Sequence, residues 1–156
     1  MKSLLIIMVI VYFVLCLILY IFQRKLLYLP TPATTIDNIK EITFMVQQTK
    51  LTGWILNEGN EKAILYYGGN AESIEENIEF FQRLLPNYTV YLINYRGYGK
   101  SQGNPTQNNL FNDALAIYDK VHQNHKSISI VGRSLGSGVA IFVASQKKID
   151  KLLLIT

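Results

Sequence analysis

The hydrophobic and polar positions divide the chain into one long apolar run and a series of shorter periodic segments. The run is 4–22, LLIIMVIVYFVLCLILYIF, which has 19 residues and no charge. A hydrocarbon core of about 30 Å needs roughly 20 apolar helical residues, so 4–22 is long enough to cross it. A cleaved signal peptide is the alternative, but its apolar region is shorter and ends in small residues. Because the run ends in the large residues Tyr20, Ile21 and Phe22, the sequence favours a retained membrane anchor.

Beyond the anchor, the pattern changes to short apolar runs that alternate with helical periodicity. Residues 42–48 and 51–57 predict a β-hairpin. The elements expected after it are strands 63–67, 89–93, 127–131 and 151–155 and helices 72–85, 105–121 (with Pro105 in its first turn) and 135–147. Single helices between strands imply right-handed crossovers and a parallel sheet covered on both faces. The expected fold class is thus α/β. The expected division is a flank 1–3, a transmembrane helix 4–22, a juxtamembrane linker 23–35 and a domain 36–156.

Charge and cysteine content add little to this picture. The formal net charge is +4, and the basic residues are scattered rather than gathered into a stripe, so nucleic-acid binding has no support. Lys2 precedes the apolar run, whereas Arg24, Lys25 and Lys40 follow it, which leans weakly toward a cytoplasmic domain. The single cysteine, Cys16, lies inside the run and cannot form an internal disulfide.

The strongest chemical signal is VGRSLGSGVA at 131–140, which contains G-x-S-x-G. It follows an apolar strand directly and opens an amphipathic helix, the setting of a nucleophile elbow. Ser134 is then the candidate nucleophile, and we expect a positive φ there because the elbow pushes its side chain out of the turn. Gly132 and Gly136 lie where side chains would clash as strand and helix fold together.

The same stretch also has the G-x-x-x-G-x-G spacing of a dinucleotide-binding loop, with Gly132, Gly136 and Gly138 as its glycines. That fingerprint normally opens its domain, whereas two strand–helix units precede it here. The acid that would contact a ribose, Asp150, comes before the next strand rather than at its far end. Dinucleotide binding therefore remains a minor alternative.

Three stretches together resemble the α/β-hydrolases. They are YGGNAE at 67–72, NYRGYGKSQG at 94–103 and VGRSLGSGVA at 131–140, each after a predicted parallel strand. The branch of membrane-anchored serine hydrolases with one N-terminal span reads H-G-N-A, D-Y-R-G-Y-G-x-S-x-G and G-x-S-L-G at these places. The resemblance runs from about Gln23 to the last residue. Gly68 and Asn94 depart from it, since the branch commonly has histidine and aspartate there.

The resemblance implies a serine hydrolase that acts on acyl esters or thioesters of lipid-like molecules. The run 4–22 makes a lipid bilayer the expected partner, and no cofactor or metal is expected. The oxyanion hole would be formed by the backbone N–H groups of Asn70 and Leu135. The remaining motif residues would shape the loops: Gly68, Gly69, Arg96, Gly97, Gly99, Gly132 and Gly136.

The triad partners of Ser134 are missing from the expected places. In this fold the acid and the histidine follow the serine along the chain, but only Asp150 and no histidine follow Ser134. His122 and His125 fall at the opposite edge of the sheet, roughly 17 Å away, and a general base must lie within about 3 Å.

Asp113 and Asp119 are expected to face outward from a helix or to cap it. We therefore expect the acid and histidine to lie outside these 156 residues, and this chain alone to be inactive. The alternative is a non-catalytic truncated α/β module at a membrane.

Overall fold

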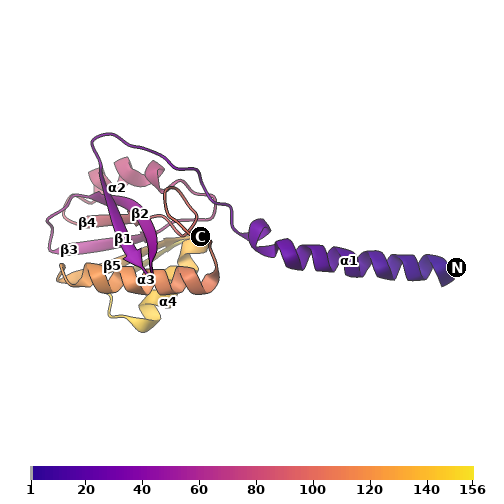
Figure 1. Ribbon diagram of the computed structural model, residues 1–156. Coiled ribbons are helices and arrows are strands. Elements are labelled where there is room, and N and C mark those ends of the chain that lie inside the picture. Colours follow the sequence, from indigo (N-terminus) through magenta and orange to yellow (C-terminus); the bar gives the residue numbers. More distant parts are fainter. Residues whose placement is uncertain (1) are drawn as a thin grey trace.

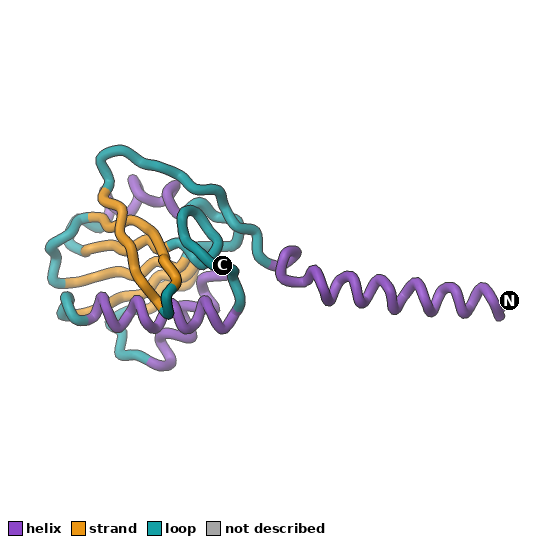
Figure 2. Tube along the Cα trace, in the orientation of Figure 1, coloured by secondary structure: helices purple, strands orange, loops and turns teal. Residues whose placement is uncertain are grey.

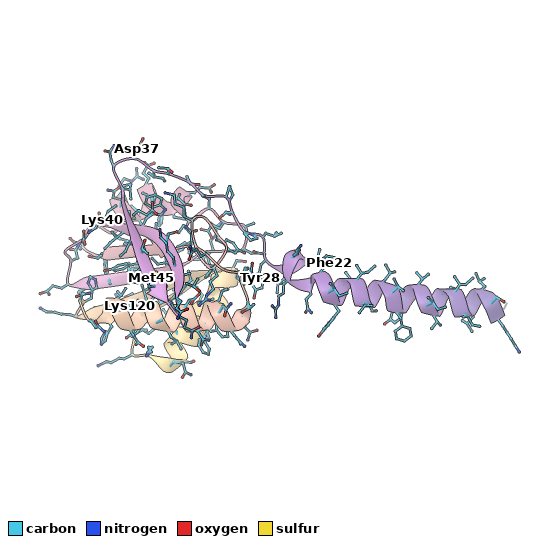
Figure 3. The ribbon with its side chains drawn as sticks, in the orientation of Figure 1. Phe22, Tyr28, Asp37, Lys40, Met45 and Lys120 are labelled. Atoms are coloured by element: carbon cyan, nitrogen blue, oxygen red, sulfur yellow. The ribbon has the colours of Figure 1, made fainter. Side chains whose placement is uncertain are left out.

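Helix α1 (Lys2–Leu27) extends away from the rest of the molecule as a straight rod in the computed structural model, which describes residues 2–156 (Figure 1). Its side chains point outward all around the rod, and none of its residues is buried (Figure 3). The helix is long and apolar enough to cross a membrane, with a mean hydropathy of 3.3 over its most apolar window. It continues beyond the expected span at Phe22 as far as Leu27, so the first part of the expected linker is helical.

The domain is built on a single mixed sheet of six strands in the order β1-β2-β4-β3-β5-β6 (Figure 2). The strands are β1 (Lys40–Val46), β2 (Thr49–Leu56), β3 (Lys62–Tyr67), β4 (Thr89–Ile93), β5 (Ser127–Arg133) and β6 (Leu152–Ile155). Strands β4, β3, β5 and β6 are parallel, whereas β1 and β2 form an antiparallel hairpin joined to β4 through β2. The predicted α/β class and the hairpin beside four parallel strands are confirmed.

Alternate residues of the strands face two separate apolar clusters, one on each side of the sheet. The first cluster joins Leu65 and Ile130 to helices α3 (Gln107–His122) and α4 (Leu135–Gln146). The second joins Tyr66 and Leu92 to the helices after β3. This alternation follows from the two-residue period of a strand, and it buries both faces.

Two predicted helix boundaries were wrong, each for a local reason. The helix expected over 72–85 begins at Ile74 as a 3-10 turn, η1 (Ile74–Asn77), and continues as α2 (Ile78–Leu84). Pro105 lies outside α3 rather than in its first turn. The N-cap of α3 is Thr106, whose Oγ1 accepts a hydrogen bond from the Asn109 N–H at 3.1 Å.

The parallel strands fix where the functional loops meet. Because β3, β4 and β5 run in the same direction, the loops that follow their carboxyl ends gather at one edge of the sheet. These loops begin at Gly68, Asn94 and Ser134, and they carry the three motifs found in the sequence. In open α/β sheets this edge is where ligands bind.

Candidate active site

Ser134 occupies the sharp turn between β5 and α4. Its backbone angles are φ 48° and ψ −113°, which confirms the predicted positive φ. A non-glycine residue with such angles is strained, and such strain often accompanies a functional position. The Ser134 N–H donates to the Ile155 carbonyl of β6 at 2.8 Å, and its side chain is exposed. The turn thus leaves the Ser134 side chain exposed to solvent at the sheet edge.

Gly132 and Gly136 allow strand and helix to approach closely at this turn. A Cβ atom on Gly132 would lie 2.6 Å from the Ala140 Cβ and 2.5 Å from the Gly136 carbonyl oxygen. A Cβ atom on Gly136 would lie 2.0 Å from the Tyr67 carbonyl oxygen of β3. Both glycines are therefore required by packing, as the sequence predicted.

Gly138 behaves differently. It lies in the exposed part of α4, and a Cβ atom there would meet nothing within 4 Å. In a dinucleotide fold the third glycine serves close packing of helix on strand. Gly138 makes no such approach, so the packing of 132–138 does not support the dinucleotide alternative.

The loop after β3, residues 68–71, lies directly beside Ser134. A Cβ atom on Gly69 would lie 3.6 Å from the Ser134 Cβ. Within residues 2–156, no group accepts a hydrogen bond from the Asn70 N–H. Leu135 is the first residue of α4, so its N–H has no partner one turn earlier in the helix. The two N–H groups predicted to form an oxyanion hole thus belong to two segments that meet at the serine.

Glu72 holds this loop in place, a role that the sequence did not reveal. Its carboxylate accepts hydrogen bonds from the Gly69 N–H, the Tyr66 hydroxyl and the Asn77 side chain. The Arg133 guanidinium lies 3.4 Å from the same carboxylate. With its oxygens occupied in this way, Glu72 orders the loop rather than serving as a free base. The only available signal was its position three residues after Gly69.

Tyrosine hydroxyls support the loop from the other side. The Tyr95 hydroxyl donates to the Gly68 carbonyl at 2.8 Å, and the Tyr98 hydroxyl donates to the Asn70 Oδ1 at 2.7 Å. Burial raises the pKa of both phenols above the ordinary value. They therefore remain protonated donors throughout the physiological pH range.

The two departures from the family pattern, Gly68 and Asn94, each have close neighbours in the structure. A Cβ atom on Gly68 would lie 2.9 Å from the Ile74 Cγ2, so a side chain there requires Ile74 to move. Asn94 is buried, and its Nδ2 lies 3.5 Å from Glu75 Oε1, which also accepts a hydrogen bond from the Trp54 indole at 3.0 Å. An amide at position 94 avoids placing a second carboxylate beside Glu75.

The loop after β4 is shaped by Arg96, which forms a buried bidentate ion pair with Asp113 of α3. Both N–O distances are 2.7 Å. The prediction that Asp113 faces outward was therefore wrong, because its carboxylate serves as the partner of the Arg96 guanidinium. Gly97 and Gly99 adopt φ of 79° and 55°, conformations that favour glycine. Their role in the loop matches the structural one expected from sequence.

The histidines and Asp150 lie at the opposite edge of the sheet. The His125 ring nitrogens are 2.9 Å from the Asn60 carbonyl and 2.9 Å from the Tyr91 hydroxyl, and Asn60 precedes β3. The Asp150 N–H bonds the Ile128 carbonyl near the start of β5. His122 is the last residue of α3, just before β5 begins. None of these three residues reaches Ser134, as the sequence predicted, so residues 2–156 place no general base at the serine.

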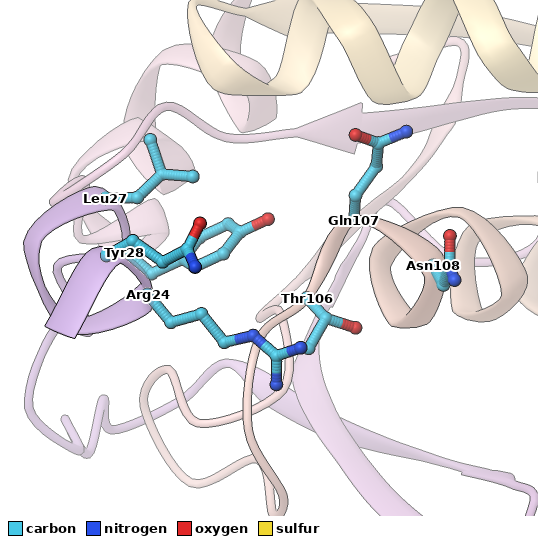
Figure 4. Close-up of a pocket in the computed structure, with 7 residues that line it drawn as sticks. Arg24, Leu27, Tyr28, Thr106, Gln107 and Asn108 are labelled. Carbon is cyan, nitrogen blue, oxygen red and sulfur yellow. The ribbon is translucent and has the colours of Figure 1, made fainter. Parts of the chain in front are cut away.

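The end of α1 contacts the domain at the edge of the sheet where Ser134 lies, through Asn70 of the loop 68–71. A pocket of about 360 Å³ separates its last turn from the start of α3 and is lined by Arg24, Tyr28 and Thr106, among others (Figure 4). The Tyr28 side chain is buried and belongs to the cluster on the α3 face of the sheet. The helix is thus attached to the domain by its last residues.

Comparison with known proteins agrees with this geometry. The family model described as the alpha/beta hydrolase fold matches residues 62–156. The chain belongs to this family. An uncharacterized membrane protein of Saccharomyces cerevisiae, YNL320W, is 30% identical over 148 residues, with 82% of this chain and 51% of that protein covered.

Two further similarities come from characterised hydrolases. The lysophosphatidylserine lipase ABHD12 of Danio rerio is 34% identical over 88 residues, with 53% of this chain and 23% of the lipase covered. The solved esterase Pf2001 of Pyrococcus furiosus superposes with a TM-score of 0.62 at 23% identity, with 81% of this chain and 55% of the esterase covered. The chain spans about half of the yeast membrane protein and less than a quarter of the lipase.

Proposed function

We propose that this chain carries the nucleophile and the oxyanion hole of a membrane-anchored serine hydrolase. The observation that carries the proposal is the strained turn at Ser134, placed between β5 and α4 and beside the loop 68–71. In α/β-hydrolases such a turn presents the attacking serine. Membership of the hydrolase family supports the same reaction class.

The proposed chemistry is acyl transfer through the Ser134 hydroxyl. Ser134 Oγ attacks the ester carbonyl, and its proton passes to a histidine base. The N–H groups of Asn70 and Leu135 stabilise the charge that develops on the carbonyl oxygen. The C–O or C–S bond of the substrate then breaks, and the alcohol or thiol leaves with the proton that the histidine holds. Water hydrolyses the remaining acyl-enzyme, which releases the carboxylic acid and restores the Ser134 hydroxyl. We propose that the histidine and its acid are supplied from outside these 156 residues, so the chain alone has no appreciable turnover.

The proposed substrates are esters or thioesters of lipid-like molecules. Two observations support this class: the exposed apolar helix α1, and the similarity to a protein named as a lysophosphatidylserine lipase. We propose that residues 4–22 cross the bilayer once and keep the site at its surface. The charge distribution around α1 favours a cytoplasmic domain.

A non-catalytic module at a membrane is the second candidate. The observation that favours it is the position of His125 and Asp150, at the sheet edge remote from Ser134. In that case the turn at Ser134 would have a structural role only, and Ser134 would not act as a nucleophile.

Hydrolysis of a p-nitrophenyl ester separates the two candidates. We expect the protein extended through the reading frame after Thr156 to hydrolyse the ester, and Ser134→Ala to lower the rate by at least about 10³-fold. Ser145→Ala, at the exposed end of α4, is the matched control and should leave the rate unchanged. Equal rates for Ser134→Ala and the unsubstituted protein would favour the non-catalytic module.

A further inference from the structure

The side chain of Asn70 joins the loop beside Ser134 to the end of helix α1. Its Nδ2 donates to the Leu27 carbonyl at 2.7 Å, and its Oδ1 accepts from the Leu29 N–H at 3.0 Å. Leu27 is the last residue of α1, more than forty positions away in sequence. The Tyr98 hydroxyl binds the same Oδ1 and also lies 3.2 Å from the Leu29 nitrogen. Asn70, Leu29 and Tyr98 thus form one hydrogen-bonded cluster.

Residues 27–31, which join helix α1 to the domain and which we call the anchor segment, are bound to the domain at further points. The Leu27 carbonyl is one of the last four of α1 that lack a helical partner, so the Asn70 amide caps it. The next side chain, Tyr28, is buried among core residues. The Thr31 carbonyl accepts from the Gly99 N–H at 3.0 Å. The segment is therefore held along its length rather than tethered at one point.

Successive residues of the loop 68–71 are bound to different partners. Gly69 is tied to Glu72, and the Gly68 carbonyl is tied to Tyr95. Among residues 2–156, the Asn70 side chain makes the hydrogen bonds that connect the loop to the anchor segment. The backbone N–H of this residue is the one assigned to the oxyanion hole, so a shift of the anchor segment would be transmitted to that group.

We propose that the anchor segment positions the loop 68–71, which carries the Asn70 N–H of the proposed oxyanion hole, through the Asn70 side chain. Tyr98 acts as a positioning residue in this contact. The inference rests on the proposed function, because it assigns a purpose to the Asn70 N–H. It makes the end of the membrane helix a structural part of the site: the loop reaches its working geometry when residues 27–31 are docked on the domain.

The first test measures the coupling without relying on catalysis. Amide hydrogen exchange at Leu29 and Gly69 is followed by NMR on the full chain in detergent micelles, since each N–H has an acceptor that reports on one side of the cluster. Loss of one hydrogen bond corresponds to about threefold to tenfold in the local opening equilibrium. We expect Asn70→Ala to accelerate exchange at both amides by about tenfold.

Two milder substitutions separate the contacts of Asn70. Tyr98→Phe removes one hydroxyl and should accelerate exchange at both amides by about threefold. Asn70→Asp keeps the acceptor for Leu29 but places a carboxylate oxygen against the Leu27 carbonyl, so it should give an intermediate effect.

The controls are Asn87→Ala and Tyr88→Phe, just before β4 at the remote edge of the sheet, which should change neither amide. If Gly69 exchange is unchanged in both Asn70→Ala and Tyr98→Phe, the loop is independent of the anchor and the inference is overturned.

The second test asks whether the coupling serves the reaction. In the extended protein, Asn70→Ala and Tyr98→Phe should lower kcat by about tenfold to a hundredfold. The change in KM should stay within about threefold, because the oxyanion exists only in the transition state. If these variants exchange the Leu29 and Gly69 amides faster but keep the kcat of the unsubstituted protein, the positioning role is overturned. If Ser134→Ala retains hydrolysis, the proposed function fails, whereas the exchange result still stands on its own.

Discussion

Substituting alanine for each of two glycines in α4 gives opposite predicted effects on stability. Gly136 is buried against β3, and an alanine Cβ there would lie 2.0 Å from the Tyr67 carbonyl oxygen and 2.7 Å from the Gly68 carbonyl oxygen. Relief of the closer contact requires a displacement of about 1 to 1.5 Å, judged against an ordinary van der Waals separation. The obstacles are backbone atoms of a central strand and of the loop beside Ser134, so neither can rotate away.

The change in unfolding free energy expected for Gly136→Ala is the sum of two opposed effects. Overpacking costs about 1–3 kcal/mol, and contact with backbone places Gly136→Ala at the upper end. Replacing glycine by alanine inside a helix returns about 1 kcal/mol. The net destabilisation is then about 2 kcal/mol. Gly138 meets nothing within 4 Å, so Gly138→Ala should stabilise by about 0.5–1 kcal/mol.

Thermal unfolding of the full chain in micelles measures the difference. Near-UV circular dichroism reports on the domain, because the single tryptophan, Trp54, is buried in its second apolar cluster, whereas no residue of α1 is buried. At about 4 °C per kcal/mol, the two variants should differ in Tm by roughly 10 °C, with Gly138→Ala above the parent and Gly136→Ala below it. Equal Tm values, or a stabilised Gly136→Ala, would refute the close approach of α4 to β3.

Three further outcomes follow from the same structure. Arg96→Ala should cost about 3 kcal/mol in unfolding free energy, because it leaves the buried Asp113 carboxylate unpaired, whereas Lys126→Ala in an exposed pair should cost less than about 1 kcal/mol. Burial raises the pKa of the Tyr67 and Tyr95 phenols in the folded protein. The free energy of unfolding should therefore be constant below about pH 10 and fall above it, because these phenols ionise first in the unfolded chain. Tm measured from about pH 8 to about pH 11.5 checks this. Leu153→Lys should reduce self-association measured by analytical ultracentrifugation, because β6 presents an exposed apolar edge.

The sequence predicted the elements well because their apolar periods are clear. The parallel strands are continuous apolar runs, the helices repeat with a helical period, and G-x-S-x-G marks the turn at Ser134. The strand order could not be read from these patterns, because it depends on which distant strands pair. The early start assigned to the helix after β3 had a local cause. Glu72 looked like a helical residue, but its carboxylate turns back to bind the Gly69 N–H.

The contacts of single polar side chains were the least predictable features. Asp113 lies on a helix with an amphipathic pattern, and nothing in that pattern distinguishes a solvated carboxylate from one paired with Arg96. The link from Asn70 to Leu27 and Leu29 joins a side chain to backbone groups across more than forty residues. Backbone groups carry no sequence signature, so the end of α1 could be predicted to lie before the domain but not to bind the loop beside the serine.

Covalent labelling of Ser134 tests the central claim most directly. The protein extended through the reading frame after Thr156 is treated with a fluorophosphonate, which reacts with activated serines, and the adduct is mapped by peptide mass spectrometry. We predict one adduct, on Ser134, that is lost in Ser134→Ala and absent from the 156-residue chain, because the described residues 2–156 place no base at the serine. An adduct on another residue would contradict the assignment of Ser134 as the nucleophile. So would the absence of any adduct from an extended protein that is folded, as judged by the same circular dichroism spectrum as its Ser145→Ala variant.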